Sequence, residues 1–337
     1  MKKSIAFVFV LALALCGMAG AFAQSEKDFT VRTKDGTVTI TGYKGKAAKV
    51  FIPATIGGLP VVGIGGFAFE NLKNITSVNI PASVTYIGWN AFDGCTGLTS
   101  VNIPASVTRI WEGAFLGCTG LTAIQADANN QAYSSRGGVL FSKTGGTLIA
   151  YPAGLKGQYS IPVGVTGIVE EAFYGCTGLT SVSIPASVTS IGKYAFWGCT
   201  GLTSISISAS VTSIGYYAFS GCTGLTSVSI PASVTYIGDE TFARCTSLTS
   251  VSIPIGVTII GIGAFADCTR LTSVSIPASV TSIDSTAFYN CTGLTSILVD
   301  TNNKKYTSRD GVQALPALVG MPFQAAPDLP QYASARM

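Results

Sequence analysis

The sequence contains few side chains that could carry out catalysis. There are nine cysteines and no histidine among 337 residues. Without histidine, the usual general base and the Ser-His and Cys-His nucleophile pairs are absent. Carboxylates occur mostly singly, and the adjacent pairs Glu170-Glu171 and Asp239-Glu240 stand at variable positions typical of solvated turns. A hydrolase or lyase could use such acids, but no acidic constellation recurs, so the residues predict a protein that is not an enzyme.

The cysteines indicate a structural role. Apart from Cys16, they occur once in each 23-residue segment: Cys95, Cys118, Cys176, Cys199, Cys222, Cys245, Cys268 and Cys291. Neighbouring copies would lie about 5 Å apart, so Cα spacing alone allows a disulfide. Parallel side chains would all point into the core, however, and Leu72 occupies the equivalent position of the first unit. We therefore expect buried free thiols, and neither a metal site nor a cofactor is predicted.

Nine large aromatic residues are the candidate partner-binding residues. They occupy positions that differ between repeats: Trp89, Trp111, Tyr174, Tyr194, Trp197, Tyr216, Tyr217, Tyr236 and Tyr289. Tyr and Trp supply rigid contact area with a polar tip and dominate many protein interfaces. The alternative is that equivalent rings stack between repeats and only shield the edge. The strongest candidates are Trp89, Tyr194, Trp197, Tyr216 and Tyr217.

A 23-residue repeat must position these residues. Eight copies are present, at residues 80–102, 103–125 and, in six tandem units, 161–298; a longer divergent unit covers residues 52–79. In the copy at 184–206, apolar or small residues hold Ile184, Val188, Ile191, Ala195, Phe196, Cys199, Leu202 and Ile205. A period of 20 to 50 residues is typical of solenoids, in which each coil packs only on its neighbours.

The residues of each copy predict a β-rich coil. Leu202-x-x-Ile205-x-Ile207 matches the L-x-x-L-x-L pattern of leucine-rich repeats, which lays one short parallel strand on the concave side. The Val-Thr-x-Ile-Gly segment is rich in β-branched residues and predicts a short strand on the opposite side. Pro185 ends the first strand and Gly192 suits a turn. The predicted fold is a leucine-rich repeat solenoid of about ten coils.

These units resemble the BspA-type leucine-rich repeats of bacterial surface proteins, whose signature is I-P-x-x-V-T-x-I-G-x-x-A-F-x-x-C-x-x-L. The resemblance covers the solenoid at residues 52–312, starting about Phe51. Residues 127–152 are similar to the long insert of that family, and two apolar runs around Gly145-Gly146 predict a β-hairpin in an enlarged coil at 126–160. The resemblance implies an adhesin for host extracellular-matrix proteins, such as fibronectin or fibrinogen, or for other cells.

The sequence pattern at the N-terminus predicts that the protein is exported. Residues 1–23 have the form of a signal peptide, with Lys2 and Lys3, an apolar run, and Ala21-Phe22-Ala23 before Gln24. The protein is therefore expected to be secreted or on the outer surface. Lipid anchoring at Cys16 is the second interpretation, weakened by the bulky Leu15. No other run approaches the 18 or so apolar residues of a membrane span. Residues 24–51 are expected to cap the solenoid.

Other partners follow from charge and from the exposed strand positions. The net charge of +4 is scattered and forms no basic stripe, so nucleic acid is not an expected partner. The Ser-x-Ser positions form a ladder of hydroxyls, which gives an alternative function, the binding of ice or a polysaccharide.

The C-terminus departs from the repeat. Residues 297–312 begin a second copy of the long insert, matching residues 124–139. From Gln313 onward there is neither strand pattern nor repeat, which predicts an irregular mobile tail at 313–337. The last coil would then lack a polar cap, and its edge could support self-association.

Overall fold

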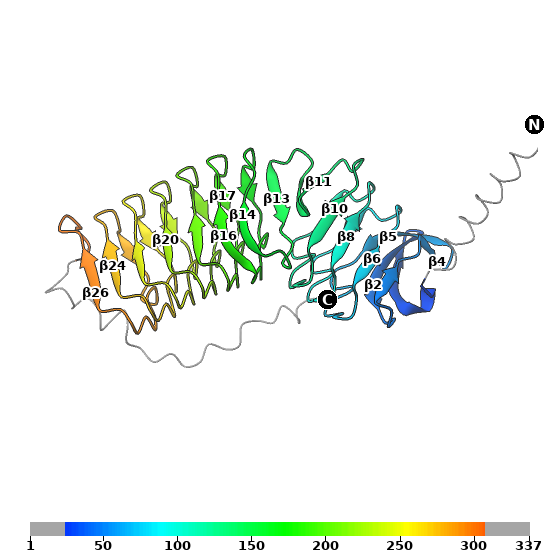
Figure 1. Ribbon diagram of the computed structural model, residues 1–337, viewed down its shortest axis with the longest axis horizontal. Coiled ribbons are helices and arrows are strands. Elements are labelled where there is room, and N and C mark those ends of the chain that lie inside the picture. The colour runs from blue at the N-terminus through cyan, green and yellow to red at the C-terminus, as the bar shows by residue number, and fades with distance from the viewer. Residues whose placement is uncertain (1–23, 307–337) are drawn as a thin grey trace, which may run out of the picture.

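The computed structural model describes residues 24–306, which wind into a parallel β-solenoid of about 11 turns (Figure 1). The described part contains one helix, the 3-10 turn η1 (Glu26–Asp28). The predicted leucine-rich repeat fold is confirmed. The predicted signal peptide at 1–23, Cys16 and the predicted tail at 313–337 lie outside the described residues.

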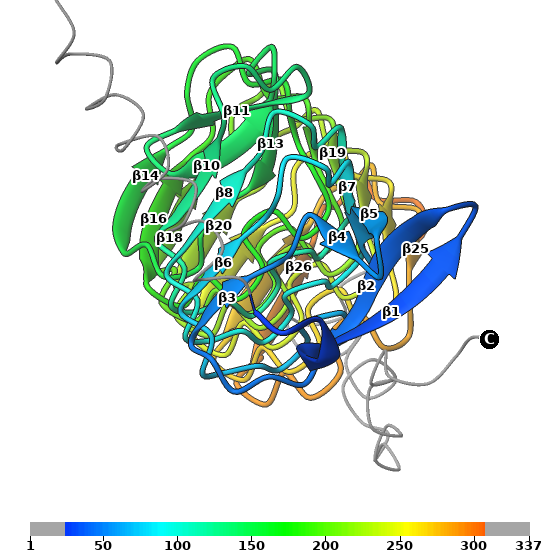
Figure 2. The same cartoon turned by 90° about the vertical axis from the view of Figure 1, so that its right-hand side faces the viewer.

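Parallel strands occupy two sides of each coil, as the end-on view in Figure 2 shows. The first side carries β3 (Lys49–Phe51), β6 (Ser77–Asn79), β8 (Ser100–Ile103), β10 (Ala123–Ala126), β14 (Gly157–Ser160), β16 (Leu179–Ser183), β18 (Ser204–Ser206), β20 (Ser227–Ser229), β22 (Ser250–Ser252), β24 (Ser273–Ile276) and β26 (Ser296–Val299). The opposite side carries β5 (Leu59–Ile64), β7 (Tyr86–Ile87), β9 (Arg109–Ile110), β15 (Gly167–Ile168), β17 (Ser190–Ile191), β19 (Ser213–Ile214), β21 (Tyr236–Ile237), β23 (Ile259–Ile260) and β25 (Ser282–Ile283).

Residues 24–51 extend both sides of the solenoid. Strand β2 (Thr37–Tyr43) pairs in parallel with β5, and β3 pairs in parallel with β6. Strand β1 (Phe29–Lys34) then pairs antiparallel with β2 at the outer edge, and β4 (Thr55–Ile56) pairs antiparallel with β5. An antiparallel strand at this position occupies the open edge of the sheet.

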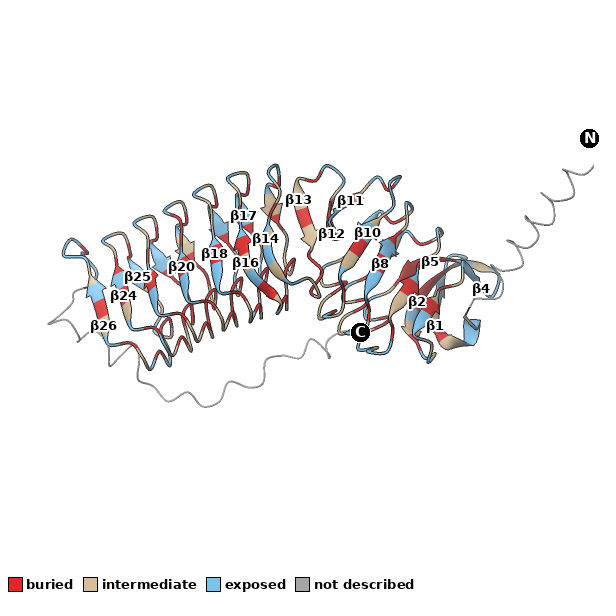
Figure 3. Cartoon of the chain, in the orientation of Figure 1, coloured by how far each residue is buried: buried red, intermediate tan, exposed pale blue. Residues whose placement is uncertain are grey.

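The core is a set of columns that run along the solenoid axis, because equivalent residues of successive coils lie beside one another. On the first side, the central residue of each strand is buried between two exposed serines, as in β18, β20 and β22; Figure 3 shows this alternation. The phenylalanines form one column, with ring centroids of Phe173, Phe196 and Phe219 separated by 4.6 and 5.1 Å.

The corner that contains this phenylalanine is also where coils bond most closely. The backbone N–H of Phe196 donates to the carbonyl of Ala218 in the next coil at 2.7 Å. The thiol of Cys222, also in the next coil, donates to the Phe196 carbonyl at 3.2 Å. The same thiol contact joins Cys95 to Phe69 and Cys268 to Phe242. All eight described cysteines are buried and free, which confirms the predicted thiol column.

Two threonine columns add bonds between coils, and they were not predicted from the sequence. Thr203 precedes strand β18, and both its N–H and its hydroxyl donate to the Thr180 carbonyl, at 2.9 and 3.1 Å. On the opposite side, Thr212 bonds the Thr189 carbonyl in the same way, at 2.9 and 3.3 Å. These hydroxyls therefore strengthen the stack although their side chains lie at its surface.

The expected hairpin of the insert is present. Strand β11 (Tyr133–Arg136) pairs antiparallel with β12 (Val139–Ser142), and β12 pairs antiparallel with β13 (Thr147–Ala150). Strand β13 then joins the parallel sheet beside β15. The insert thus rejoins the solenoid as one modified coil, and Tyr151 takes the place of the phenylalanine, with its ring 4.8 Å from that of Phe173.

Two copies of one polar motif cover the ends of two runs of coils. The buried Asn130 amide donates to the carbonyls of Pro104 and Val107 and accepts from the N–H groups of Ala132 and Tyr133. The Tyr133 hydroxyl accepts from the Ile110 N–H, which lies in the last short strand, β9, before the insert.

Asn303 and Tyr306 repeat these bonds on the last coil. Asn303 donates to Pro277 and Val280, and the Tyr306 hydroxyl accepts from Ile283 in β25. The prediction that the last coil lacks a polar cap is therefore wrong. The beginning of the second insert is enough to satisfy these groups, since one buried amide can make several hydrogen bonds at once.

Replacement of the column phenylalanine should be far more harmful than replacement of the strand serines. We expect Phe196→Ala to lower the free energy of unfolding by about 3 to 5 kcal/mol, because it leaves a cavity between two stacked rings. Ser204→Ala and Ser227→Ala, on exposed positions, are the controls and should change it by less than about 0.5 kcal/mol. Urea unfolding monitored by circular dichroism measures both. Equal losses would mean that the inside and outside of the coil are misassigned.

The eight buried thiols should resist modification while the protein is folded. Burial raises the pKa of Cys245 and of Cys291 to about 12, so the reactive thiolate is scarce at neutral pH. We expect thiol reagents to leave all eight unmodified in native buffer and to label all eight in denaturant, as read by peptide mass mapping. Detection of one native disulfide among them would refute the thiol column.

Candidate binding surface

The candidate residues lie mainly on the segments that connect each short strand to the next buried cysteine. We call this face of the solenoid the turn edge; its segments are residues 88–94, 111–117, 169–175, 192–198, 215–221, 238–244, 261–267 and 284–290. Within each segment the Ala-Phe pair, or Thr-Phe in one coil, is buried. The residues on either side of that pair differ from coil to coil, and most of them are not buried; Ser220 and Ala243 are the buried exceptions after the pair.

Bulky residues on the turn edge adopt left-handed backbone conformations. The position before the Ala-Phe pair has φ of +62° at Glu171, +53° at Tyr194 and +60° at Tyr217. Glycine occupies the same position at Gly113 and Gly263. A left-handed conformation costs an L-residue about 1 to 2 kcal/mol relative to the right-handed one. Tyrosines at a position that suits glycine are a reason to examine this surface for function.

The structure brings eight of the nine candidate aromatics into pairs between neighbouring coils. The ring centroids are 4.5 Å apart in Tyr174–Trp197 and 4.8 Å apart in Tyr194–Tyr217, both stacked. Two further pairs are edge-to-face, Trp89–Trp111 at 5.4 Å and Tyr216–Tyr236 at 6.2 Å. Tyr289, the ninth candidate, belongs to the last turn segment, and its carbonyl accepts from the Asp267 N–H.

Pairing does not remove these side chains from the surface. Trp89 is 55% exposed and Tyr216 is 41% exposed, and the other seven are half-buried. Three of the pairs lie on consecutive coils and form what we call the aromatic patch: Tyr174, Tyr194, Trp197, Tyr216, Tyr217 and Tyr236. Equivalent rings therefore both stack and face solvent.

Polar contacts fix the outer members of the aromatic patch. Tyr236 belongs to strand β21 and donates its hydroxyl to Asp239 at 3.1 Å. Burial and this contact with Asp239 raise the pKa of Tyr236 to about 12, so the hydroxyl remains a donor near neutral pH. The Lys193 ammonium lies 5.9 Å from the centre of the Tyr216 ring, within cation–π range.

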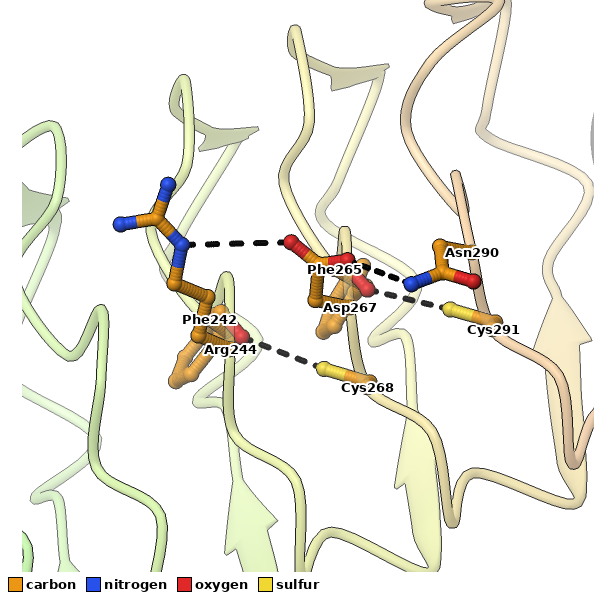
Figure 4. A network of polar contacts seen from close by, with 7 residues as sticks. All are labelled: Phe242, Arg244, Phe265, Asp267, Cys268, Asn290 and Cys291. Atoms are coloured by element: carbon orange, nitrogen blue, oxygen red, sulfur yellow. Dashed lines mark hydrogen bonds and ion pairs between the residues drawn. The ribbon is translucent and has the colours of Figure 1, made fainter. Parts of the chain in front are cut away.

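Beyond the aromatic patch the turn edge carries a network of polar contacts (Figure 4). Arg244 Nε lies 3.9 Å from Asp267 Oδ2, and Asn290 donates to the other oxygen of Asp267 at 2.8 Å. In the same view, Cys268 and Cys291 point to the phenylalanine carbonyls of the core. Polar residues thus lie on the outside of these segments, and the cysteine that follows each segment bonds to the core.

A cleft interrupts the turn edge at the insert, and we call it the notch. Its cavity volume is about 180 Å³, and its lining includes Trp111, Glu112, Glu170, Glu171 and Tyr174. Burial first, and then Glu170, Glu112 and Asp93, raise the pKa of Glu171 to about 7. Burial and Glu70 raise the pKa of Asp93 to about 6. Acidic side chains are therefore concentrated beside two aromatic walls.

Sequence reasoning missed the notch and the cations beside the aromatic rings. The guanidinium of Arg109 lies 3.5 Å from the centre of the Trp111 ring, a contact that joins strand β9 to the turn edge. The notch could have been found by counting the residues between the two parallel strands of each coil, because the insert has fewer between β13 and β14 (Gly157–Ser160) than a regular coil has. Within residues 24–306 there is neither a group of acidic, Cys or His side chains suited to a metal ion nor a helix able to cross a membrane.

Glu171 in the notch and Asp93, which interacts with it electrostatically, should make stability fall as the pH rises. Folding raises the pKa of Asp93 and of Glu171, so both groups contribute fully to the free energy of unfolding below about pH 4. This contribution is lost as the pH rises through about 6 for Asp93 and about 7 for Glu171. We expect Glu171→Gln to raise the free energy of unfolding by about 1 to 3 kcal/mol at pH 8 relative to the unsubstituted protein and to leave it nearly unchanged at pH 4. Glu240→Gln, at the same position of another coil, is the matched control for urea unfolding across this range. Identical effects of the two substitutions would contradict the assignment.

Comparison with known proteins identifies one family of repeats. A model of the BspA type leucine rich repeat region matches residues 50–156 and 157–269 in six copies. A leucine rich cell surface protein from Faecalibacterium prausnitzii is 28% identical, over 84% of this chain and 96% of its own, with a TM-score of 0.45. No curated protein sequence matches the chain.

Two further solved structures share the fold. A leucine-rich repeat protein from Eubacterium ventriosum is 23% identical over 82% of this chain and 92% of its own, with a TM-score of 0.57. The pneumococcal vaccine antigen PcpA is 19% identical over 79% and 73%, with a TM-score of 0.53. The family model covers more than half of the chain, with the repeat signature and the buried Phe-Cys corner in agreement. The chain therefore belongs to the BspA-type leucine-rich repeat family.

Proposed function

We propose that this protein is an exported adhesin that binds host extracellular-matrix proteins or other cells through the turn edge. The observation that carries the proposal is the aromatic patch, in which three ring pairs on consecutive coils occupy positions that the core does not need. Tyrosine and tryptophan supply much of the binding energy in protein interfaces. A rigid solenoid presents them without the entropy cost of ordering a loop.

Membership of a repeat family supports binding and not catalysis. Repeat proteins generally use an extended regular surface to hold a partner. Export follows in this proposal from the N-terminal signal-peptide pattern, with secretion or display on the outer surface as the outcome. Self-association through the C-terminal edge is a smaller part of the proposal, since Asn303 and Tyr306 already cover part of that edge.

The serine array supports the alternative ligands, ice or a polysaccharide, less well. The exposed serines are in register along β20, β22 and β24, where Ser227, Ser250 and Ser273 are successive partners. This sheet does not run the length of the solenoid, because it is divided into runs that end at β10 and at β18. An extended lattice surface would need longer regular spacing than these runs provide.

The adhesin proposal predicts that matrix binding depends on the aromatic patch. We expect the purified protein to bind immobilised fibronectin or fibrinogen in biolayer interferometry, and the double variant Tyr194→Ala/Trp197→Ala to bind at least 10-fold more weakly, because it removes one ring from each of two adjacent stacked pairs. The matched control is Ser204→Ala/Ser227→Ala on the serine array, which should retain full affinity.

Each contrary result has a defined meaning. Equal loss in the aromatic and serine variants would contradict the assignment of the binding face. If the unsubstituted protein binds neither fibronectin nor fibrinogen, the choice of these partners is contradicted. Thermal hysteresis in the unsubstituted protein would favour the ice-binding alternative.

A further inference from the structure

The notch exists because the insert takes a shorter path than a regular coil. In the coil of Phe196, 12 residues (192–203) separate the end of β17 from the start of β18. In the insert, only 6 residues (151–156) separate the end of β13 from the start of β14. The insert therefore connects its two strands without a turn-edge segment, which leaves a gap one coil wide in that face.

Backbone contacts across the insert reflect the missing segment. The insert has no cysteine that could donate to the Phe115 carbonyl, as Cys118 does to Phe92. Gly154 instead donates to the Leu121 carbonyl at 2.7 Å, which ties the shortened path directly to the preceding coil. The coils on both sides are thus held at a fixed separation, with the insert as the floor of the notch.

The two walls of the notch are aromatic and acidic. Trp111 and Glu112 come from the preceding coil, and Glu170, Glu171 and Tyr174 come from the following coil. The Glu171 carboxylate spans the gap, since its Oε2 lies 3.0 Å from the point where a Cβ on Gly113 would stand. A larger residue at Gly113 would therefore meet the Asn90 side chain first and then this carboxylate.

The negative charge of the notch is poorly compensated. The one ion pair among residues 24–306 joins Arg244 and Asp267, away from the notch. Lys193 offsets part of the charge of Glu170, and Arg109 lies on the face of Trp111. Burial is the main cause of the raised pKa of Glu171, about 7, and repulsion by Glu170, Glu112 and Asp93 raises it further. A cation inside the notch would relieve this repulsion.

We propose that the notch binds one cationic side chain, lysine or arginine, of a protein partner. The volume of about 180 Å³ is below the range of about 300 to 1,000 Å³ typical of small-molecule sites, and it suits a single side chain. Carboxylates on opposite walls provide charge-assisted hydrogen bonds, and Tyr174 provides a surface for cation–π contact beside Trp111, whose own ring already carries Arg109. This inference rests on the proposed function, because it assumes a protein ligand, and it adds the chemistry of one anchor residue.

Short peptides test the notch independently of any matrix protein. The probes are Ac-Gly-Arg-Gly-NH₂ and its neutral isostere Ac-Gly-Cit-Gly-NH₂, titrated at pH 8 into ¹⁵N-labelled protein. We expect saturable chemical-shift changes for the arginine peptide at residues 111–116 and 169–174, and at least 10-fold weaker binding of the citrulline peptide. Equal binding of the two peptides, or shifts confined to other residues, would overturn the proposal.

Substitutions then separate the notch from other acidic surface. Glu112→Gln/Glu171→Gln should weaken binding of the arginine peptide at least 5-fold, because it removes a charge from each wall while it retains side-chain size. Asp239→Asn/Glu240→Gln, on a regular coil, should leave it unchanged. Circular dichroism and the spectrum of the free protein verify that each variant is folded. Unchanged affinity in the folded notch variant would refute the proposal.

The outcomes distinguish this inference from the adhesin proposal. If the arginine peptide binds in the notch but neither fibronectin nor fibrinogen is bound, the matrix partners are wrong and the notch assignment stands. If matrix binding depends on the aromatic patch but the peptide does not bind, the notch assignment fails by itself.

Discussion

The whole solenoid depends on one corner, where each coil is bonded to the next through the phenylalanine backbone. The Phe196 N–H donates to Ala218, its carbonyl accepts the Cys222 thiol, and its ring stacks between Phe173 and Phe219. A buried carbonyl needs a donor, and in this narrow space the donor must also tolerate an apolar environment. Cysteine satisfies both conditions. This requirement explains one free cysteine per coil without a disulfide or a metal.

The same constraint leaves most of the neighbouring positions free to vary. Because the Ala-Phe pair and the cysteine point inward, most of the residues that flank the pair lie at the surface and differ between coils, although Ser220 and Ala243 are buried. Aromatic residues at these positions stack at close to the spacing of the coils, as Tyr194 and Tyr217 do. Stacking rigidifies the rings and keeps their outer parts exposed, so the structural and the binding interpretations of these residues are compatible.

The insert is the part of the solenoid where the 23-residue period is interrupted and where the notch forms. It conserves the coil-to-coil bonding through Tyr151 and Gly154 while it omits a turn-edge segment. The cost is a break in the column of phenylalanines. The result is a recess bordered by acids from two coils that would otherwise be separated by a third. The motif of Asn130 and Tyr133 closes the first run of coils at this break, and Asn303 and Tyr306 repeat it at the last coil.

From the amino-acid sequence we could predict the period, the core positions, the parallel strands on two sides and the buried thiols, because every repeat meets an equivalent repeat and one copy therefore describes its neighbours. It also located the insert and its partial second copy. Two contacts became known from the tertiary structure alone: Asn303 caps the last coil, and Glu112 and Glu171 face one notch. These contacts arise where the period is broken, so the path of the insert, and not the repeat, sets which side chains meet.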